Sequence, residues 1–285
     1  MIKFIKYFIQ AILVYFSFLI MKIIGLRLSR YLFSFIFKFI GPIIRKNSIA
    51  IKNLLRFQKN LDREKQNEII SKMWSNYGMT FVEYIFLKNF RERNSHIKIE
   101  GEKILDTVLE NKKPVIFISG HFANFELMSM EITKKKINLA TIYRPLNNYF
   151  LNPFMEYLRV KFICNNQIKK GIGGVKEAIN FINKGHSIAL MIDQRVSEGE
   201  KIKFFNEDAL TTTLPAQLAL KFDLDIIPIY LERKNNNSFF MKINKPIDLS
   251  KLNNKTDVSK KLNQILEDMI SQNPYQWIWT HNRWK

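Results

Sequence analysis

Residues 114–130 read PVIFISGHFANFELMSM, and this stretch decides the fold. The apolar run at 115–119 has the length and composition of a buried strand. His121 follows one residue after that run, and Asn124 is a helix-capping residue type in front of a helical pattern at 125–134. A buried strand that leads directly into a helix is typical of α/β domains. We therefore predict His121 at the carboxyl end of a strand, where open α/β sheets bind ligands.

The same alternation of strand and helix continues along the chain. The predicted strands are 115–119, 139–143, 188–193 and 226–231, and the predicted helices are 125–134, 151–160, 173–184 and 213–222. The run IALMI before Asp193 is apolar on both faces, as a buried parallel strand should be. Residues 47–90 repeat apolar positions every three to four residues and predict a helical lead-in. The fold class is therefore α/β, with a mostly parallel central sheet flanked by helices.

The N-terminus predicts a membrane-anchoring helix. Residues 7–21 (YFIQAILVYFSFLIM) carry no charge, and a second apolar stretch at 31–44 is interrupted by one lysine. Fifteen residues are fewer than the roughly 20 that a spanning helix needs, although the stems of flanking lysines can lengthen it. A cleaved signal peptide is one rival reading, but no small-residue cleavage site follows, and a buried helix of a soluble protein is the other. We predict an anchor and amphipathic segment at 1–45 and a catalytic domain at 46–285.

The charge distribution predicts the side of the membrane and the kind of partner. The net charge is +20, and basic residues after the apolar run (Arg27, Arg30, Arg45, Lys46, Lys52) outnumber those before it (Lys3, Lys6). By the positive-inside rule the catalytic domain is cytoplasmic, with its basic surface toward anionic lipid. No zinc-finger spacing, RNA-recognition signature or basic zipper is present, so we expect no nucleic acid partner. The single cysteine, Cys164, excludes an internal disulfide and a cysteine-built metal site.

His121 and Glu126 form a candidate catalytic pair. Five residues correspond to about 140° around an ideal helix, so the two side chains would not share a helical face. With His121 on the turn and Glu126 in the first helical turn, however, the carboxylate can reach back to the imidazole. Glu126 would then fix the tautomer of His121, which would take a proton from an incoming hydroxyl. The alternative is structural, with a core histidine and a glutamate that the helix dipole favours.

A set of motifs runs through the chain in a defined order. His121 and Glu126 are followed by Tyr143-Arg144-Pro145, Asp193-Gln194-Arg195, Phe204-Phe205 before Thr211-Thr212-Thr213, and the terminal QWIWTHNRW at 276–284. In this order the motifs resemble the lipid A biosynthesis lauroyl/myristoyl acyltransferase family, which belongs to the bacterial lysophospholipid-acyltransferase-like superfamily. The resemblance covers the chain from the N-terminal anchor to the last residue. In one departure, many relatives follow the threonines with glycine, whereas this chain has Leu214-Pro215.

The resemblance implies an enzyme at the cytoplasmic face of the bacterial inner membrane. It would move a fatty acyl group from an acyl-carrier-protein thioester to a hydroxyl of a lipid A precursor, in lipopolysaccharide biosynthesis. A coenzyme A thioester is the alternative donor, and no metal or other cofactor is implied. The implied catalytic residues are His121, Glu126, Arg159 and Asp193, and the implied substrate-binding residues are Arg144, Gln194, Arg195 and Thr212.

Several roles stay open at this point. Arg159 would stabilise an oxyanion, contact a phosphate or phosphopantetheine, or pair with Asp193. Asp193 would orient Arg159 or the helices around it, or cap a strand end. The tryptophans of the terminal segment receive no chemical role. The rival acceptors are a lysophospholipid, an ornithine lipid or another glycolipid, and the rival from a different class is a basic protein that only binds membrane surfaces.

Overall fold

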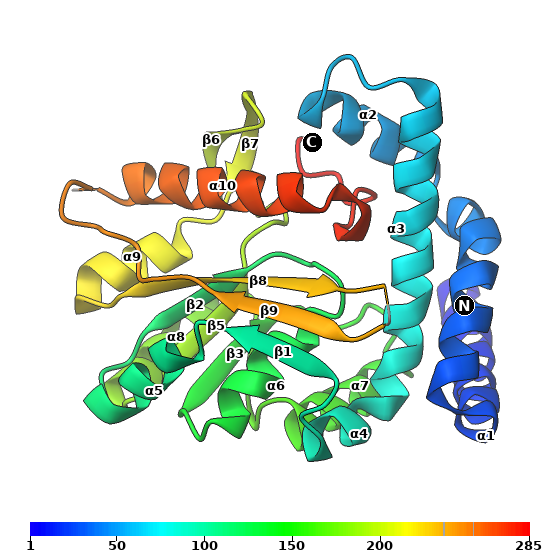
Figure 1. The fold of residues 1–285 in the computed structure, drawn as a ribbon, viewed down its shortest axis with the longest axis horizontal. Helices are drawn as coiled ribbons and strands as arrows, with labels where there is room; N and C mark the ends of the chain where they lie inside the picture. Colours follow the sequence, from blue (N-terminus) through cyan, green and yellow to red (C-terminus); the bar gives the residue numbers. More distant parts are fainter. Residues whose placement is uncertain (236, 253) are drawn as a thin grey trace.

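The computed structural model describes residues 1–235, 237–252 and 254–285. At its centre lies a seven-stranded sheet in the order β1–β9–β8–β2–β5–β3–β4 (Figure 1), and its strand pairs are parallel except β8–β9. A separate antiparallel hairpin is formed by β6 and β7. The strands are β1 Ile97–Glu100, β2 Ile116–Ser119, β3 Leu139–Tyr143, β4 Asn166–Lys169, β5 Ser187–Met191, β6 Glu200–Phe204, β7 Glu207–Thr211, β8 Ile226–Arg233 and β9 Phe239–Ile243.

Helices cover both faces of the sheet. They are α1 Ile2–Ile44, α2 Asn47–Phe57, α3 Arg63–Glu83, α4 Leu87–Glu92, α5 Glu102–Asn111, α6 Glu126–Lys134, α7 Asn152–Phe162, α8 Ile172–Asn183, α9 Leu214–Phe222 and α10 Lys255–Gln272. Successive side chains of a strand point to opposite faces. Ile116 and Ile118 therefore pack with α8, α9 and α10, whereas Val115 and Phe117 pack with α4 to α7. Figure 1 shows α9 and α10 on one side of the sheet and α5, α6 and α7 on the other.

The predicted fold class is confirmed. Each of the four predicted strands corresponds to a strand of the sheet, and the predicted helices correspond to α6, α7, α8 and α9 with ends that differ by one or two residues. The helical lead-in at 47–90 is α2, α3 and α4. The structure adds elements that were not predicted, namely the strands β1, β4 and β9, the β6–β7 hairpin and the helices α5 and α10.

The N-terminal helix α1 folds back on itself at Gly25. This glycine has φ 79° and ψ 168°, a backbone conformation that is open almost only to glycine. Phe18 and Phe33 both stack near Phe81, with ring centroids 5.2 and 5.9 Å from it. In a straight helix they would lie about 22 Å apart. Gly25 therefore separates α1 into two arms, 2–24 and 26–44, that form a V.

The second arm of α1 packs along α3. Gly78 lies so close to this arm that a Cβ there would be 2.2 Å from the carbonyl oxygen of Phe33, and a Cβ on Gly41 would be 2.2 Å from the ring of Trp74. Figure 1 shows α1 beside α3 at one end of the molecule. By length and composition α1 is the one candidate membrane span within the described residues. It ends at Ile44, and the division at residue 45 stays a prediction.

Candidate active site

A cavity of about 440 Å³ opens at the carboxyl ends of β2, β3 and β5. Chain order and sheet order diverge here, because β3 follows β2 in the sequence while β5 lies between them, which makes this edge a topological switch point. Six of the eight predicted site residues line the cavity, namely His121, Glu126, Arg144, Arg159, Gln194 and Thr212. Asp193 is buried beside it, so the fold gathers residues that lie far apart in the sequence.

The carboxylate bonded to His121 is Asp193. The distance from His121 Nδ1 to Asp193 Oδ1 is 2.7 Å, and the His121 backbone N–H donates to Asp193 Oδ2 at 2.9 Å. The register of the parallel strands explains this contact. Ser119 of β2 pairs with Met191 of β5, so the residues two positions further along each strand lie side by side. The predicted role of Asp193 in orienting Arg159 is therefore wrong, because Asp193 contacts the imidazole instead.

Asp193 is held as an anion. Burial raises the pKa of its carboxyl group, but the charge of His121 and hydrogen bonds from His121 and Trp277 outweigh burial and lower the pKa to about 2. The indole N–H of Trp277 donates to Asp193 Oδ2 at 2.8 Å. Three donors thus fix the carboxylate, and Nδ1 of the imidazole faces it. Nε2 of His121 is left on the side of the cavity, 3.4 Å from the Gln194 amide nitrogen.

Glu126 binds Arg159. Its Oε1 accepts hydrogen bonds from Arg159 Nε at 2.8 Å and Nη2 at 2.6 Å, and from the Tyr84 hydroxyl at 2.9 Å. Within the described residues Glu126 and His121 share no hydrogen bond, so the expected reach of this carboxylate to the imidazole does not occur. The starting position of α6 explains the difference, because Glu126 is its first residue and points across to α7. The pairing of Arg159 with Asp193 that we considered is also absent there.

Arg159 keeps one nitrogen free for a ligand. Burial lowers its pKa, but the charges of Glu126 and Tyr84 and their hydrogen bonds together outweigh burial and raise the pKa above the ordinary value, so the guanidinium stays charged. Its Nη1 is buried and has no partner among the described residues. An unpaired buried donor is costly, and this one belongs to a residue that lines the cavity. It is suited to bind a negatively charged oxygen of a substrate or intermediate.

The loop that carries His121 is fixed from two sides. Ala123 has a positive φ of 46°, which is uncommon for a residue with a Cβ, and its backbone bonds to Gln276 and to the Thr80 hydroxyl. The amide of Asn124 donates to Glu83 Oε2 at 3.0 Å. The predicted capping role of Asn124 is therefore wrong, since its side chain points to α3 and α6 has no side-chain cap.

Glu83 is the centre of a buried cluster that joins three elements. Its carboxylate accepts from Arg30 of α1 at 2.7 Å and forms a short ion pair with Arg233 of β8, in addition to the bond from Asn124. Burial raises the pKa of Glu83, but the two guanidinium charges outweigh it and lower the pKa. Helix α1, the sheet and the loop that carries His121 thus share one carboxylate.

The C-terminal segment closes the cavity. His281 lines it and accepts from the backbone N–H of Arg195 at 3.0 Å, so that Arg195 contributes a backbone contact while its side chain bonds the Lys285 carbonyl. Burial lowers the pKa of His281 to about 4, which keeps it neutral. Thr212 lines the cavity, and its hydroxyl accepts from Leu214 N at the start of α9.

Sequence reasoning missed the roles of Trp277 and Tyr84 in this site. Trp277 is 1% exposed, and its one polar atom bonds the carboxylate behind the histidine. The signal for Trp277 was the dense terminal motif at 276–284, in which tryptophans stand close to polar residues. Tyr84 follows the long amphipathic stretch of α3, and nothing in its local pattern indicates that it reaches Glu126. Tyr84 reaches Glu126 only through the packing of α3 against the rest of the domain, which its local sequence does not indicate.

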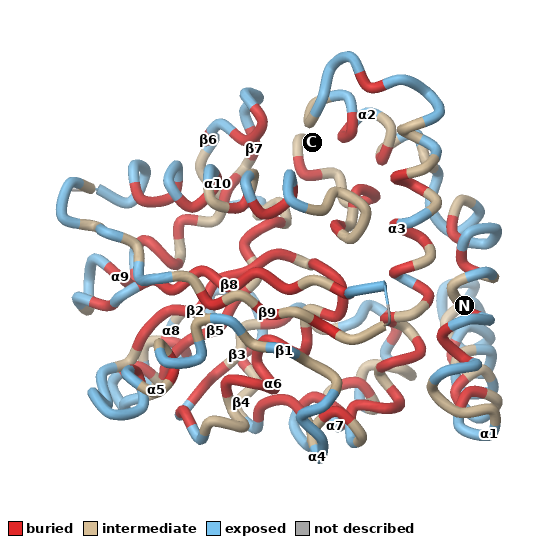
Figure 2. The backbone as a smooth tube through the Cα atoms, viewed as in Figure 1, coloured by how far each residue is buried: buried red, intermediate tan, exposed pale blue. Residues whose placement is uncertain are grey.

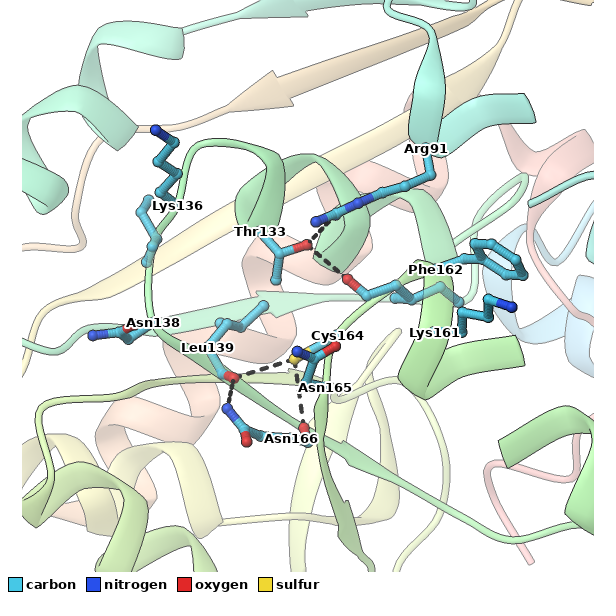
Figure 3. Close-up of a pocket in the computed structure, with 12 residues that line it drawn as sticks. Arg91, Thr133, Lys136, Asn138, Leu139, Lys161, Phe162, Cys164, Asn165 and Asn166 are labelled. Atoms are coloured by element: carbon cyan, nitrogen blue, oxygen red, sulfur yellow. Dashed lines mark hydrogen bonds between the residues drawn. The ribbon is translucent and has the colours of Figure 1, made fainter. Parts of the chain in front are cut away.

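A second cavity, of about 230 Å³, lies at the opposite edge of the sheet, beside the first residue of β3. Figure 3 shows that its polar groups bond to one another: Arg91 points to Thr133, and Cys164 and Asn166 point to the carbonyl oxygen of Leu139. Burial raises the pKa of the Cys164 thiol and keeps it protonated. These contacts stabilise the ends of α6 and α7, and we assign no chemistry to this cavity.

Comparison with known proteins points to one family. A family model described as bacterial lipid A biosynthesis acyltransferase matches residues 2–285. A lipid A biosynthesis acyltransferase from Haemophilus influenzae is 23% identical over 89% of this chain and 82% of its own length. Two Escherichia coli relatives, a lipid A biosynthesis palmitoleoyltransferase and a lauroyltransferase, are 24% and 21% identical over 85% of this chain and 79% of their own lengths. On this match across its whole length, the chain belongs to the bacterial lipid A biosynthesis acyltransferase family.

Proposed function

We propose that this protein transfers a fatty acyl group from an acyl-carrier-protein thioester to a hydroxyl of a lipid A precursor, at the cytoplasmic face of the inner membrane. The observation that carries the chemistry is the 2.7 Å contact of His121 Nδ1 with Asp193, which leaves Nε2 on the cavity side. A histidine held in this way by a buried carboxylate is arranged as a general base. The family supplies the reaction class and its place in lipid A biosynthesis.

In the proposed reaction His121 Nε2 takes the proton from the acceptor hydroxyl as its oxygen attacks the thioester carbonyl carbon. A carbon–oxygen bond forms, and the carbonyl oxygen becomes an oxyanion. The intermediate then collapses, the carbon–sulfur bond breaks, and the departing thiolate receives the proton from His121. Asp193 stabilises the imidazolium between the two proton transfers, and an arrangement of this kind contributes about 10²–10⁴ in rate.

Arg159 and Glu126 act as a second pair in this proposal. The free Nη1 of Arg159 stabilises the oxyanion, and Glu126 holds the guanidinium in place through two hydrogen bonds. Glu126 is therefore a positioning residue for Arg159. Catalysis should therefore still require Glu126, because it positions Arg159 and not because it contacts His121.

The remaining lining of the cavity fits an acyl chain and an anionic head group. Phe125, Ile142, Leu190, Leu214 and Ile278 supply apolar surface, and Arg45, Arg144 and Lys170 supply positive charge. Burial and the nearby Arg144 lower the pKa of Lys170, as expected when cations are gathered to meet an anion. Phosphate groups on the acceptor, or the phosphopantetheine of the donor, are suited to this charge.

The decisive experiment is mass spectrometry of lipids after membranes with this protein are incubated with acyl-carrier-protein thioester and a tetra-acylated lipid A precursor. We expect a gain of one acyl chain that is absent in His121→Ala. Acylation of an added lysophospholipid instead would keep the chemistry and change the acceptor. If neither lipid is acylated, while His121→Ala binds membranes as the wild type does, a surface-binding protein would be the better explanation.

Two amide variants distinguish the proposed roles of Asp193 and Glu126. Asp193→Asn should lower kcat about 10³-fold with little change in KM, because an amide cannot stabilise the imidazolium. Glu126→Gln should lower kcat less, and added guanidinium salts should not restore it, because Arg159 is still present but misplaced. Single-turnover assays with purified variants would measure both effects. Equal activity of Asp193→Asn and wild type would contradict the proposed His121–Asp193 pair.

A further inference from the structure

The outer sides of both arms of α1 carry large exposed apolar side chains, which together we call the apolar face. It includes Leu13, Phe16 and Leu19 of the first arm and Leu28, Phe35 and Phe39 of the second, each between 57% and 63% exposed. Figure 2 shows exposed segments along the side of α1 that faces away from α3. Large apolar side chains gathered in this way would promote aggregation if they faced water, so they mark an interaction site.

The arms are attached to the rest of the protein along their length. In the first arm, Phe8 and Tyr15 make edge-to-face contacts with Phe150 and Phe154, with ring centroids 5.4 and 5.7 Å apart, and the backbone carbonyl of Tyr7 accepts from Asn148. The second arm lies on α3 as described above. A helix that crosses a bilayer alone is surrounded by lipid on all sides. Crossing here would also draw polar groups of α3 and of the 146–151 loop into hydrocarbon, at several kcal/mol for each unsatisfied group.

The charges on α1 also argue against a helix that crosses the bilayer. Lys6 and Lys22 bracket an uncharged segment that would be about 22 Å long, shorter than the roughly 30 Å of hydrocarbon. Lys22 and Arg27 lie on either side of the Gly25 turn, and inserting that turn into the bilayer centre would cost about 2.5–3.5 kcal/mol for each charge. Basic residues at the ends of apolar arms are typical of helices that lie in the interface, where their side chains reach the head groups.

The rim of the active-site cavity adjoins this apolar face. Leu146 and Asn147 line the cavity, and the ring of Tyr149 in the same loop packs against Phe4 and Tyr7 of the first arm, at 6.1 and 5.6 Å between ring centroids. Leu146 and Tyr149 are themselves 40% and 48% exposed. The entrance to the cavity and the apolar face therefore belong to one side of the molecule.

We propose that α1 is an in-plane anchor that lies in one leaflet of an anionic bilayer and does not cross it. The apolar face and the 146–151 loop enter the leaflet together, and residue 1 stays on the same side of the membrane as the catalytic residues. The acceptor then reaches His121 from within the leaflet, without leaving the lipid. This proposal rests on the membrane location proposed above and refines it.

Single-cysteine labelling tests the topology. Cys164 is 3% exposed, so a Cys164→Ala background supplies a chain without thiols, to which Ile2→Cys, Arg27→Cys or the reference Lys59→Cys is added. A membrane-impermeant maleimide is applied to sealed inside-out and right-side-out vesicles that contain the full chain. We expect all three positions to react only from the side on which Lys59→Cys reacts. Reaction of position 2 or 27 from the opposite side, or protection of position 27 on both sides, would overturn the proposal.

Fluorescence quenching by spin-labelled lipids tests whether the 146–151 loop enters the leaflet. A fluorescent probe on Tyr149→Cys should be quenched by lipids that carry a nitroxide near the head group. A probe on Leu109→Cys should not be quenched, because this residue is 42% exposed near the end of α5, which leads to the amino end of β2 and so lies at the opposite end of the sheet from the cavity. Equal quenching at both positions would contradict insertion of the loop. Neither readout needs turnover, so correct labelling with no acylation would remove the proposed function alone, and acylation with labelling from both sides would remove the in-plane anchor alone.

Discussion

Trp277 and Trp279 are two residues apart and nearly equally buried, yet their indole N–H groups have different partners. Trp277 donates to Asp193, whereas Trp279 donates to the Pro274 carbonyl. We expect Trp277→Phe to lower kcat about tenfold and to move the acid limb of the pH–rate profile upward, because Asp193 loses one of its donors. Trp279→Phe creates a similar cavity and is the matched control. A stability loss in both variants with unchanged pH profiles would assign Trp277 to packing alone.

His281 should make stability depend on pH. Burial lowers its folded-state pKa to about 4 from 6.5, so the folded protein favours the neutral form, which accepts from Arg195 N–H. This contribution is complete above pH 6.5 and is lost as the pH falls toward 4, by up to about 3 kcal/mol. Unfolding of detergent-solubilised protein between pH 7 and pH 4 would measure it. His281→Gln should flatten this pH dependence, and an unchanged slope would show that other groups cause it.

At the scale of single residues, the sequence identified the members of the site better than their partners. His121, Glu126, Arg159 and Asp193 all lie in or beside one cavity. The pairing was wrong because sequence spacing suggested a local contact between His121 and Glu126. The actual contact depends on the register of β2 and β5, which are more than sixty residues apart. The sequence held one signal for this contact, because His121 and Asp193 each follow a buried strand.

Among the elements, the α1–α3 contact should be the most sensitive to a small added side chain. Gly78→Ala would place a Cβ 2.2 Å from the Phe33 carbonyl oxygen, so the arm must move, and we expect a loss of about 1–3 kcal/mol in the free energy of unfolding. Gly173→Ala in α8 meets nothing within 4 Å and should be neutral or stabilising by up to about 1 kcal/mol. Limited proteolysis of the N-terminal arm and denaturant unfolding would compare them. Equal stability of the two variants would contradict tight packing.

The elements that the sequence predicted correctly are those with a strong local signal. β3 and β8 begin at the predicted residues, because both are apolar runs bounded by polar or turn residues. β4 and β6 were missed because they lie at a sheet edge or in a hairpin and carry polar side chains such as Gln167 and Lys203. The fold-back of α1 was missed too, since one glycine in a long apolar pattern is compatible with a straight helix.

The charge of the whole molecule bears on its encounter with the donor. With a net charge of +20, the protein should attract an acidic carrier protein over long distances. We expect kcat/KM for an acyl-carrier-protein thioester to fall about tenfold between 50 and 500 mM salt. The matched control is a short neutral pantetheine thioester, whose kcat/KM should change little. A parallel fall with both donors would indicate that salt acts on the enzyme or the lipid surface.

The cluster around Glu83 limits how this protein can change over evolutionary time. A membrane tether is usually exchangeable, since any apolar helix can perform that task. Here Arg30 of the proposed anchor α1 and Asn124 of the loop that carries His121 bond to the same buried carboxylate, together with Arg233. A chimera with an unrelated helix would leave Glu83 with one arginine fewer and would disturb the loop that carries His121. The N-terminal helix and the catalytic domain should therefore be inherited as one unit.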